Sequence, residues 1–272
     1  MSTVLDTPRR GVRTTGLRPR MRVVEYQMYV GRRIWRSVFV VSVLQPLAYV
    51  VALGVGLGAI IDTGGHHPLG VSYIQFVAPA FLTAAALQIA AADASYPIMA
   101  GFKWIRTFHG MAATPLTPAQ ICDGQLIFVA IRIALNSAVY LAIMAAFGGT
   151  QRWAVLLTVP IATLTAMAFA APIAALAATI EREGNAFNMV FRFVVTPMFL
   201  FSGTFYPISE LPHWGQWLAW VTPLWHGTDL ARGVAIGGLG AGAAIVHLAY
   251  LLAWLVAGVA LARWRFCVRV TR

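Results

Sequence analysis

Residues Phe199–Gly233, FLFSGTFYPISELPHWGQWLAWVTPLWHGTDLARG, are the stretch that decides the fold class. The stretch is apolar, yet it contains the prolines Pro207, Pro212 and Pro223 and the tryptophans Trp214, Trp217, Trp220 and Trp225. A helix in a bilayer core tolerates proline only where other groups satisfy the freed backbone. Tryptophans gather where hydrocarbon meets the lipid headgroups. We therefore predict that this stretch leaves the membrane core, lies along the outer face and dips back as a re-entrant helical hairpin.

The composition places the rest of the chain in a membrane as well. The 272 residues are 59% hydrophobic and 11% charged, with a mean hydropathy of +0.73. A soluble domain carries about 25% charged residues. The net charge of +11 does not indicate nucleic-acid binding, because the basic residues flank apolar runs instead of forming one soluble face. The two cysteines give no disulfide framework.

The apolar runs predict an all-α integral membrane protein with six transmembrane helices. The expected spans are Val38–Ile61, Val71–Ala92, Ile121–Phe147, Trp153–Ile180, Ala186–Phe205 and Gly242–Leu261. Residues 1–19 are expected to form a disordered cytosolic tail, and residues 20–272 a single transmembrane domain. Val38–Ile61 is long enough to cross a ~30 Å core, so we interpret it as an anchor and not as a cleaved export signal.

An amphipathic helix is expected ahead of the first span. One helical face carries polar residues and the other carries apolar ones. The polar face comprises Arg22, Glu25, Tyr29, Arg32 and Arg36, and the apolar face comprises Val23, Val24, Met28, Val30, Ile34 and Trp35. Such a helix lies in the membrane interface. The alternative is that it is only the polar start of the first span.

The arginines predict the orientation of the chain. Nine of them precede the first span, and further basic residues follow the second span, the fourth span and the last span. The alternate loops hold only Arg152 and Arg232. Because basic residues stay on the cytosolic side, we expect a multi-pass protein of the plasma (inner) membrane with both termini in the cytosol.

The chain lacks the motifs of an active site. Lys103 is the only lysine, and no phosphate-binding loop of the G-x-x-x-x-G-K-[ST] type is present. The histidines show no metal-ligand spacing, and no serine lies in a nucleophile-elbow motif. We expect no cofactor and no metal in this chain.

Two segments resemble a known family. Ser202-Gly203-Thr204-Phe205-Tyr206-Pro207 followed by PLWHGTDLARG, and Arg106-Thr107-Phe108 followed by Ala113-Thr114-Pro115-Leu116-Thr117-Pro118, resemble ABC-transporter permeases of the type-2 exporter class. The nearest branch comprises permeases for nodulation lipo-oligosaccharides and for drug or polyketide efflux. The resemblance implies a separate ATP-binding cassette subunit that holds ATP and Mg. It also implies a second copy of this chain or a paralogous permease.

The resemblance assigns a role to the loop Asp93–Gln120. In that family this loop carries a coupling helix that seats in the ATP-binding subunit, and here we expect a short helix near Trp104–Ala113. The implied contacts are Arg106, Phe108, His109, Met111 and Thr114. Many relatives carry an acidic residue where His109 stands. The alternative is an interfacial helix on lipid.

Polar residues inside spans are costly and so informative. Arg132 is expected to pair with Asp93, with Asp123 or with a lipid phosphate. Spans two and five line the dimer interface in the resembling family, which makes Gln88, Asp93, Thr196 and Ser202 the candidates for a translocation path. For each of these residues the alternative is a hydrogen bond between helices of one subunit.

The sequence thus predicts the permease of an ATP-driven exporter of an amphipathic substrate such as a lipid-linked saccharide, polyketide or hydrophobic drug. The outer hairpin would gate the path through Gly203, Tyr206, Pro207, Pro212, Trp217, Trp220 and Pro223. The alternative for the hairpin is a passive anchor in the headgroups. Two other functions compete. One is a membrane enzyme acting on lipid headgroups, whose acidic residues Asp93, Asp123, Glu181 and Glu183 are dispersed. The other is a non-transporting assembly protein.

Overall fold

The chain is described from a computed structural model. The structure describes residues 16–33, 40, 43–44, 47–63, 70–148, 152–181 and 185–271. Every element in these ranges is helical, as predicted. The predicted tail lies outside the described residues up to position 15, and helix α1 (Leu17–Gly31) begins shortly after that.

Four helices are long and apolar enough to cross a membrane. They are α4 (Tyr73–Ala94) with its continuation α5 (Tyr96–Lys103), α7 (Pro118–Ala146), η3 (Trp153–Leu157) with α8 (Thr158–Thr179), and α13 (Ala241–Thr271). They confirm the second, third, fourth and sixth predicted spans. Helices α5 and α13 run past the predicted ends, because a helix need not stop where the hydrocarbon gives way to headgroups.

The other two predicted spans are only partly matched. The fifth corresponds to a shorter apolar helix, Ala186–Phe201, built from α9 (Ala186–Val190), the π-helix η4 (Phe191–Val195) and α10 (Thr196–Phe201). Of the first, the structure describes the π-helix η1 (Val50–Leu57) and α3 (Gly58–Thr63), while part of residues 38–49 lies outside the described ranges. A total of six spans stays a prediction.

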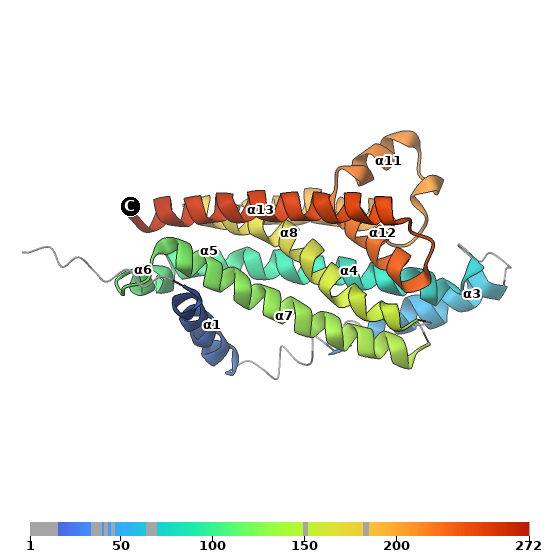
Figure 1. Cartoon of the computed structure of the whole chain (residues 1–272), viewed down its shortest axis with the longest axis horizontal. Coiled ribbons are helices and arrows are strands. Elements are labelled where there is room, and N and C mark those ends of the chain that lie inside the picture. Colours follow the sequence, from blue (N-terminus) through green and yellow to red (C-terminus); the bar gives the residue numbers. More distant parts are fainter. Residues whose placement is uncertain are drawn as a thin grey trace, which may run out of the picture.

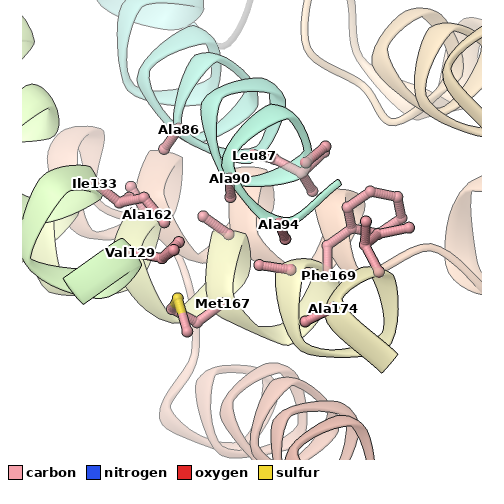
Figure 2. Packing of buried hydrophobic residues seen from close by; sticks show 14 of the residues in the cluster. Ala86, Leu87, Ala90, Ala94, Val129, Ile133, Ala162, Met167, Phe169 and Ala174 are labelled. Carbon is pink, nitrogen blue, oxygen red and sulfur yellow. The ribbon is translucent and has the colours of Figure 1, made fainter. Parts of the chain in front are cut away.

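Helix α8 forms the centre of the bundle and packs against α4, α7, α13 and α12 (Pro223–Ile236). Its sequence is rich in alanine, and buried alanines of α4 and α8 face one another in Figure 2. Two glycines let neighbouring helices approach it closely. A Cβ atom at Gly227 would lie 2.1 Å from Thr165 Oγ1, and one at Gly258 would lie 2.5 Å from Pro172 Cδ. Small residues at such contacts are typical of membrane helix packing.

Helix α1 docks on α7 through Val23 and Val24, which are both buried. A Cβ atom at Gly124 of α7 would lie 2.5 Å from Val23 Cβ, so the close approach needs this glycine. Met28 and Val30, placed by the sequence on the same apolar face, are exposed. The amphipathic helix therefore exists, and its predicted position in the membrane interface stays a prediction.

The loop between the second and third spans is shorter than predicted, because α5 continues the helix to Lys103. The short helix α6 covers Thr107–Ala112, within the expected Trp104–Ala113. It begins late because Arg106 has a left-handed backbone (φ 56°) that interrupts the helix. Helix α7 then starts at Pro118, where Thr117 and Gln120 form a capping box, so the prolines end one helix and start the next as expected.

The tryptophan-rich stretch forms a pair of helices after a short 3-10 turn, η5 (Ile208–Glu210). Helix α11 (His213–Trp220) follows Pro212, and α12 begins with Pro223. In Figure 1, α11 stands away from the bundle while α12 lies against it. The prediction that Arg232 lies in a loop is wrong, since it belongs to α12 and is buried.

Candidate functional site

The two ends of the bundle carry different chemistry. The end formed by α1, α5, α6 and the C-terminal part of α13 is rich in arginine and is termed the charged end (Figure 1). The end formed by α11 and α12 with the start of α4 is termed the tryptophan end. The predicted coupling residues lie at the charged end, and the predicted gate residues lie at the tryptophan end.

At the charged end, the turn before α6 projects from the protein. Trp104, Ile105 and Arg106 are all exposed, with 70% of Ile105 accessible. Within the described part of the chain, Arg106 is the non-glycine residue with a positive φ. Such a backbone conformation is strained and is enriched at functional positions. This exposed turn is therefore suited to contact a partner.

Phe108 anchors this turn to the bundle. Its ring is buried between Phe102 of α5, at 4.8 Å between ring centroids, and Phe266 of α13, at 5.4 Å. A Cβ atom at Gly101 would lie 2.5 Å from this ring, so a glycine is needed there. In this conformation Phe108 contacts α5 and α13 of its own chain.

The remaining predicted coupling residues differ in exposure. His109 is half-buried, its ring 6.0 Å from Phe102, and its Nδ1 atom has no hydrogen-bond partner among the described residues. Met111 packs against the hydrophobic core. Thr114 is exposed, and its hydroxyl donates to the Met111 carbonyl at 2.6 Å.

The four predicted path residues do not gather in one place. Asp93 is held by Arg132, whose Nη1 donates to Asp93 Oδ1 at 3.0 Å, which identifies the partner among those expected. Gln88 is half-buried on α4, and Thr196 is exposed with its hydroxyl bonded to the Phe191 carbonyl. Ser202 is fully buried at the tryptophan end.

Asp123 joins three helices at the charged end. Its buried carboxylate accepts hydrogen bonds from Arg20 of α1 at 2.8 Å and from Arg263 of α13 at 2.6 and 3.0 Å. Helix α1 and the last turns of α13 meet at this carboxylate. Helix α1 and the C-terminus of α13 therefore lie at the same end of the bundle.

At the tryptophan end, Gly203 and Arg232 connect the hairpin to α4. Gly203 has a φ of 71°, a conformation that favours glycine. Its carbonyl accepts from Arg232 Nη2 at 2.7 Å, while Arg232 Nε donates to the Phe76 carbonyl at 3.2 Å. The Arg232 guanidinium also lies 3.9 Å from the centroid of the Phe76 ring. A buried charge is thus satisfied by two carbonyls and one aromatic face.

Hydroxyl groups complete the base of the hairpin. Ser202 Oγ lies 3.0 Å from Thr222 Oγ1, and Thr228 donates to the Ser202 carbonyl at 3.0 Å. Tyr206 donates to the Leu200 carbonyl at 3.0 Å. Pro207 and Pro212 precede the short helices η5 and α11, and Pro223 is buried as the first residue of α12.

Both predicted gate tryptophans present their rings to the surroundings. Trp217 is 66% exposed and Trp220 is 40% exposed, and their rings contact each other at 5.1 Å. Exposed indoles on a short apolar helix are typical of headgroup depth.

A histidine pair joins α12 to α13. His226 Nδ1 lies 2.8 Å from His247 Nδ1, His226 Nε2 lies 3.0 Å from the Trp220 carbonyl, and His247 Nε2 lies 3.1 Å from Asp229 Oδ2. The Trp220 carbonyl and the Asp229 carboxylate accept hydrogen bonds, so each Nε2 contact is a hydrogen bond when that ring nitrogen carries a proton. No metal cluster of three or more ligands occurs among the described residues.

Sequence reasoning missed Arg232 and the histidine pair. The signal for α12 was present, since a threonine followed by proline, Thr222-Pro223, is a typical helix start. No sequence signal brings His247 beside His226, because the two residues lie on different helices.

The acidic residues named for the alternative of a membrane enzyme pair with arginines where the structure describes them. Asp93 and Asp123 are each bound to arginines, and Glu181 lies 3.6 Å from Arg269. Glu183 lies outside the described residues.

Comparison with known proteins assigns the family. The model of the ABC-2 type transporter family matches residues 23–236, which include both the exposed turn and the hairpin. The chain belongs to the ABC-2 type transporter family. It is therefore a multi-pass membrane subunit of an ABC transporter, as the resemblance implied. The family match ends with α12 and does not include α13.

Characterised relatives support the same assignment. The chain is 31% identical over 227 residues to Nodulation protein J of Bradyrhizobium diazoefficiens, covering 82% of this chain and 84% of the relative. It is 30% identical over 207 residues to Nodulation protein J of Rhizobium leguminosarum bv. trifolii, covering 75% and 77%. No solved structure matches the chain.

Proposed function

We propose that this chain is the permease subunit of an ATP-driven exporter that moves an amphipathic substrate outward across the plasma membrane. The apolar spans and the similarity to Nodulation protein J support this substrate class, because the sequence resembles the branch of lipo-oligosaccharide permeases. Two permeases, identical or paralogous, would bind two ATP-binding cassette subunits, which hold the ATP and Mg. Both termini would lie in the cytosol, because the charged end holds the basic residues.

The observation that carries the proposal is the exposed turn at Arg106 with its buried anchor Phe108. A partner seated on this turn would push against Phe108, and the ring would pass the force to Phe102 on α5 and Phe266 on α13. Helix α5 continues α4, which contacts the central helix α8. Closure of the ATP-binding subunits would in this way reach the helices that surround the path.

The path itself is proposed to run near Gln88, Asp93, Thr196 and Ser202, and the hairpin is proposed to close it from outside. The burial of Ser202 and its bonds to the hairpin support a closed state at that end. The scattered positions of the other three residues fit a path that forms only between two permeases.

Coupling is tested with the chain and its ATP-binding subunit in proteoliposomes. We expect Arg106→Glu or His109→Glu to abolish substrate-stimulated ATP hydrolysis and export while the protein still inserts, because a wrong charge at a docking face disrupts recognition. The matched control is Arg22→Glu, an exposed arginine of α1 at the same end. Full export by the Arg106 and His109 variants would refute the coupling role.

A further inference from the structure

A pocket of about 480 Å³ opens at the charged end, between α5, α6 and the last turns of α13. Its lining consists of Phe102, Lys103, Arg106, His109, Glu181 and Arg269. We propose that this pocket binds a phosphate group carried by a membrane lipid. The inference goes beyond the proposed transport function, because it assigns a ligand to the permease alone.

The charges of the pocket favour an anion. Three lining side chains are cationic and one is a carboxylate. Glu181 Oε1 lies 3.6 Å from Arg269 Nη1, too far for a hydrogen bond, so the carboxylate offsets part of the charge without occupying that donor. A phosphate offers several acceptor oxygens to guanidinium and ammonium groups.

Two polar atoms in this lining lack hydrogen-bond partners within the described residues. Arg269 Nη1 and His109 Nδ1 are shielded from solvent and make no hydrogen bond. Buried donors without acceptors are rare in folded proteins, and each such atom calls for an explanation. A phosphate in the pocket would supply the missing acceptor for Arg269, and also for His109 when its Nδ1 carries the proton.

The backbone at the pocket rim is held in a strained form. Arg106 adopts its left-handed conformation at the point where α5 has ended and α6 has not begun. Strain of this kind persists where the surrounding structure fixes it, often at ligand sites. If α5 continued, Arg106 would lie one helical turn beyond Lys103. The left-handed turn instead keeps Arg106 in the lining of the pocket.

The surroundings favour a lipid as the carrier of the phosphate. Trp104 and Ile105 next to the rim are exposed, and Trp264 on α13 is 54% exposed. Tryptophans and basic residues together mark the headgroup layer. The buried Phe102, which also belongs to the lining, would contact the apolar part of a lipid better than it would a soluble ion.

The test uses the purified full chain without its ATP-binding subunit, in neutral detergent micelles. Retention of added phosphatidylglycerol is measured by native mass spectrometry as the lipid is titrated, with phosphatidylcholine and inorganic phosphate in parallel. We expect saturable retention of the lipid. Arg269→Gln and Lys103→Gln should each weaken the affinity for the lipid by about tenfold, because each removes one charge-assisted hydrogen bond to the phosphate. The matched control is Arg265→Gln, an arginine of the same helix that stacks on Trp264 outside the lining.

The outcomes separate the possibilities. If Arg265→Gln loses as much lipid retention as the pocket variants, the anionic lipid is attracted diffusely, and the proposed pocket site is overturned. Unchanged retention in both pocket variants would also overturn it. Saturation by inorganic phosphate at lower concentration than by lipid would overturn the lipid source. Thermal unfolding identifies a variant that fails to fold. If Arg269→Gln fails to fold, Lys103→Gln still tests whether the pocket retains the lipid.

The result is distinguishable from failure of the transport proposal. Lipid retention needs no nucleotide and no partner, whereas coupling is measured as partner-dependent ATP hydrolysis. Full export by the Arg106→Glu and His109→Glu variants, with normal lipid retention by the native chain, would count against coupling alone.

Discussion

At the charged end, Asp123 pairs with both Arg20 and Arg263 across three helices, and both arginines stay partly open to water, 31% and 48% exposed. At the tryptophan end, Arg232 is buried and is held by the carbonyls of Phe76 and Gly203 and by an aromatic ring. At the charged end, water can take the place of the carboxylate as the partner of each arginine. At the tryptophan end, the partners of Arg232 are backbone carbonyls, whose positions are set by the fold. We infer that Arg232 fixes the base of the hairpin at the tryptophan end, while the charged end can rearrange when a partner binds.

The largest effect is expected from Arg232→Met. Methionine fills much of the space but removes the buried Arg232 donors to the Phe76 and Gly203 carbonyls and the cation on the Phe76 ring, so we expect a loss of about 3–5 kcal/mol of unfolding free energy. Chemical unfolding of the purified protein in micelles measures it. Arg22→Met on the exposed face of α1 is the control and should change stability by less than about 0.5 kcal/mol. Similar losses for both variants would contradict the contrast between the two ends.

Gly203→Leu should have the next largest effect, about 2 kcal/mol, because leucine is strained at a φ of 71°. The control is Gly238→Leu. Gly238 also has a positive φ, 91°, but no atom lies within 4 Å of a Cβ added there. If the hairpin is a gate, Gly203→Leu also reduces export in proteoliposomes while Gly238→Leu does not. If the hairpin is a passive anchor, the stability of Gly203→Leu falls while its export stays unchanged.

Asp123→Asn should cost about 1–2 kcal/mol, since its partly exposed partners regain water when the charge is lost. We expect this difference to shrink in high salt, which screens exposed charges, whereas the effect of Arg232→Met should not depend on salt. Glu25→Gln, in an exposed pair with Arg22 at 3.7 Å, is the control and should be near neutral. If the loss of stability in Asp123→Asn did not depend on salt, Asp123 would be shielded from water as Arg232 is, which would contradict the contrast between the two ends.

The smallest effect concerns pH and the histidine pair. Burial lowers the pKa of His226, which lies on α12 outside the four spanning helices. The unfolded chain therefore binds a proton more readily, so stability is full above the unfolded pKa of about 6.5 and is lost as pH falls below it. Thermal unfolding at several pH values should show this loss in the native protein and less of it in His226→Gln. Exposed His213→Gln should keep the native profile.

Much of this architecture follows from the residues alone. The four long spans are continuous apolar runs, and such runs in lipid must be helical because every backbone group needs an internal partner. The helix starts at Pro118 and Pro223 follow from threonine caps ahead of proline. The family follows from the motifs at Arg106 and at Ser202-Gly203, and the match to residues 23–236 confirms it.

What the sequence did not determine was which distant groups meet. Arg132 had three possible partners, and packing of α7 against α4 selected Asp93. The sequence predicts a loop position for Arg232, because no local pattern shows that the Phe76 and Gly203 carbonyls converge on it. Apolar periodicity and caps act over a few residues, so they fix the helices. Charge partners and the phosphate pocket depend on contacts between helices far apart in the chain, which only their packing around α8 decides.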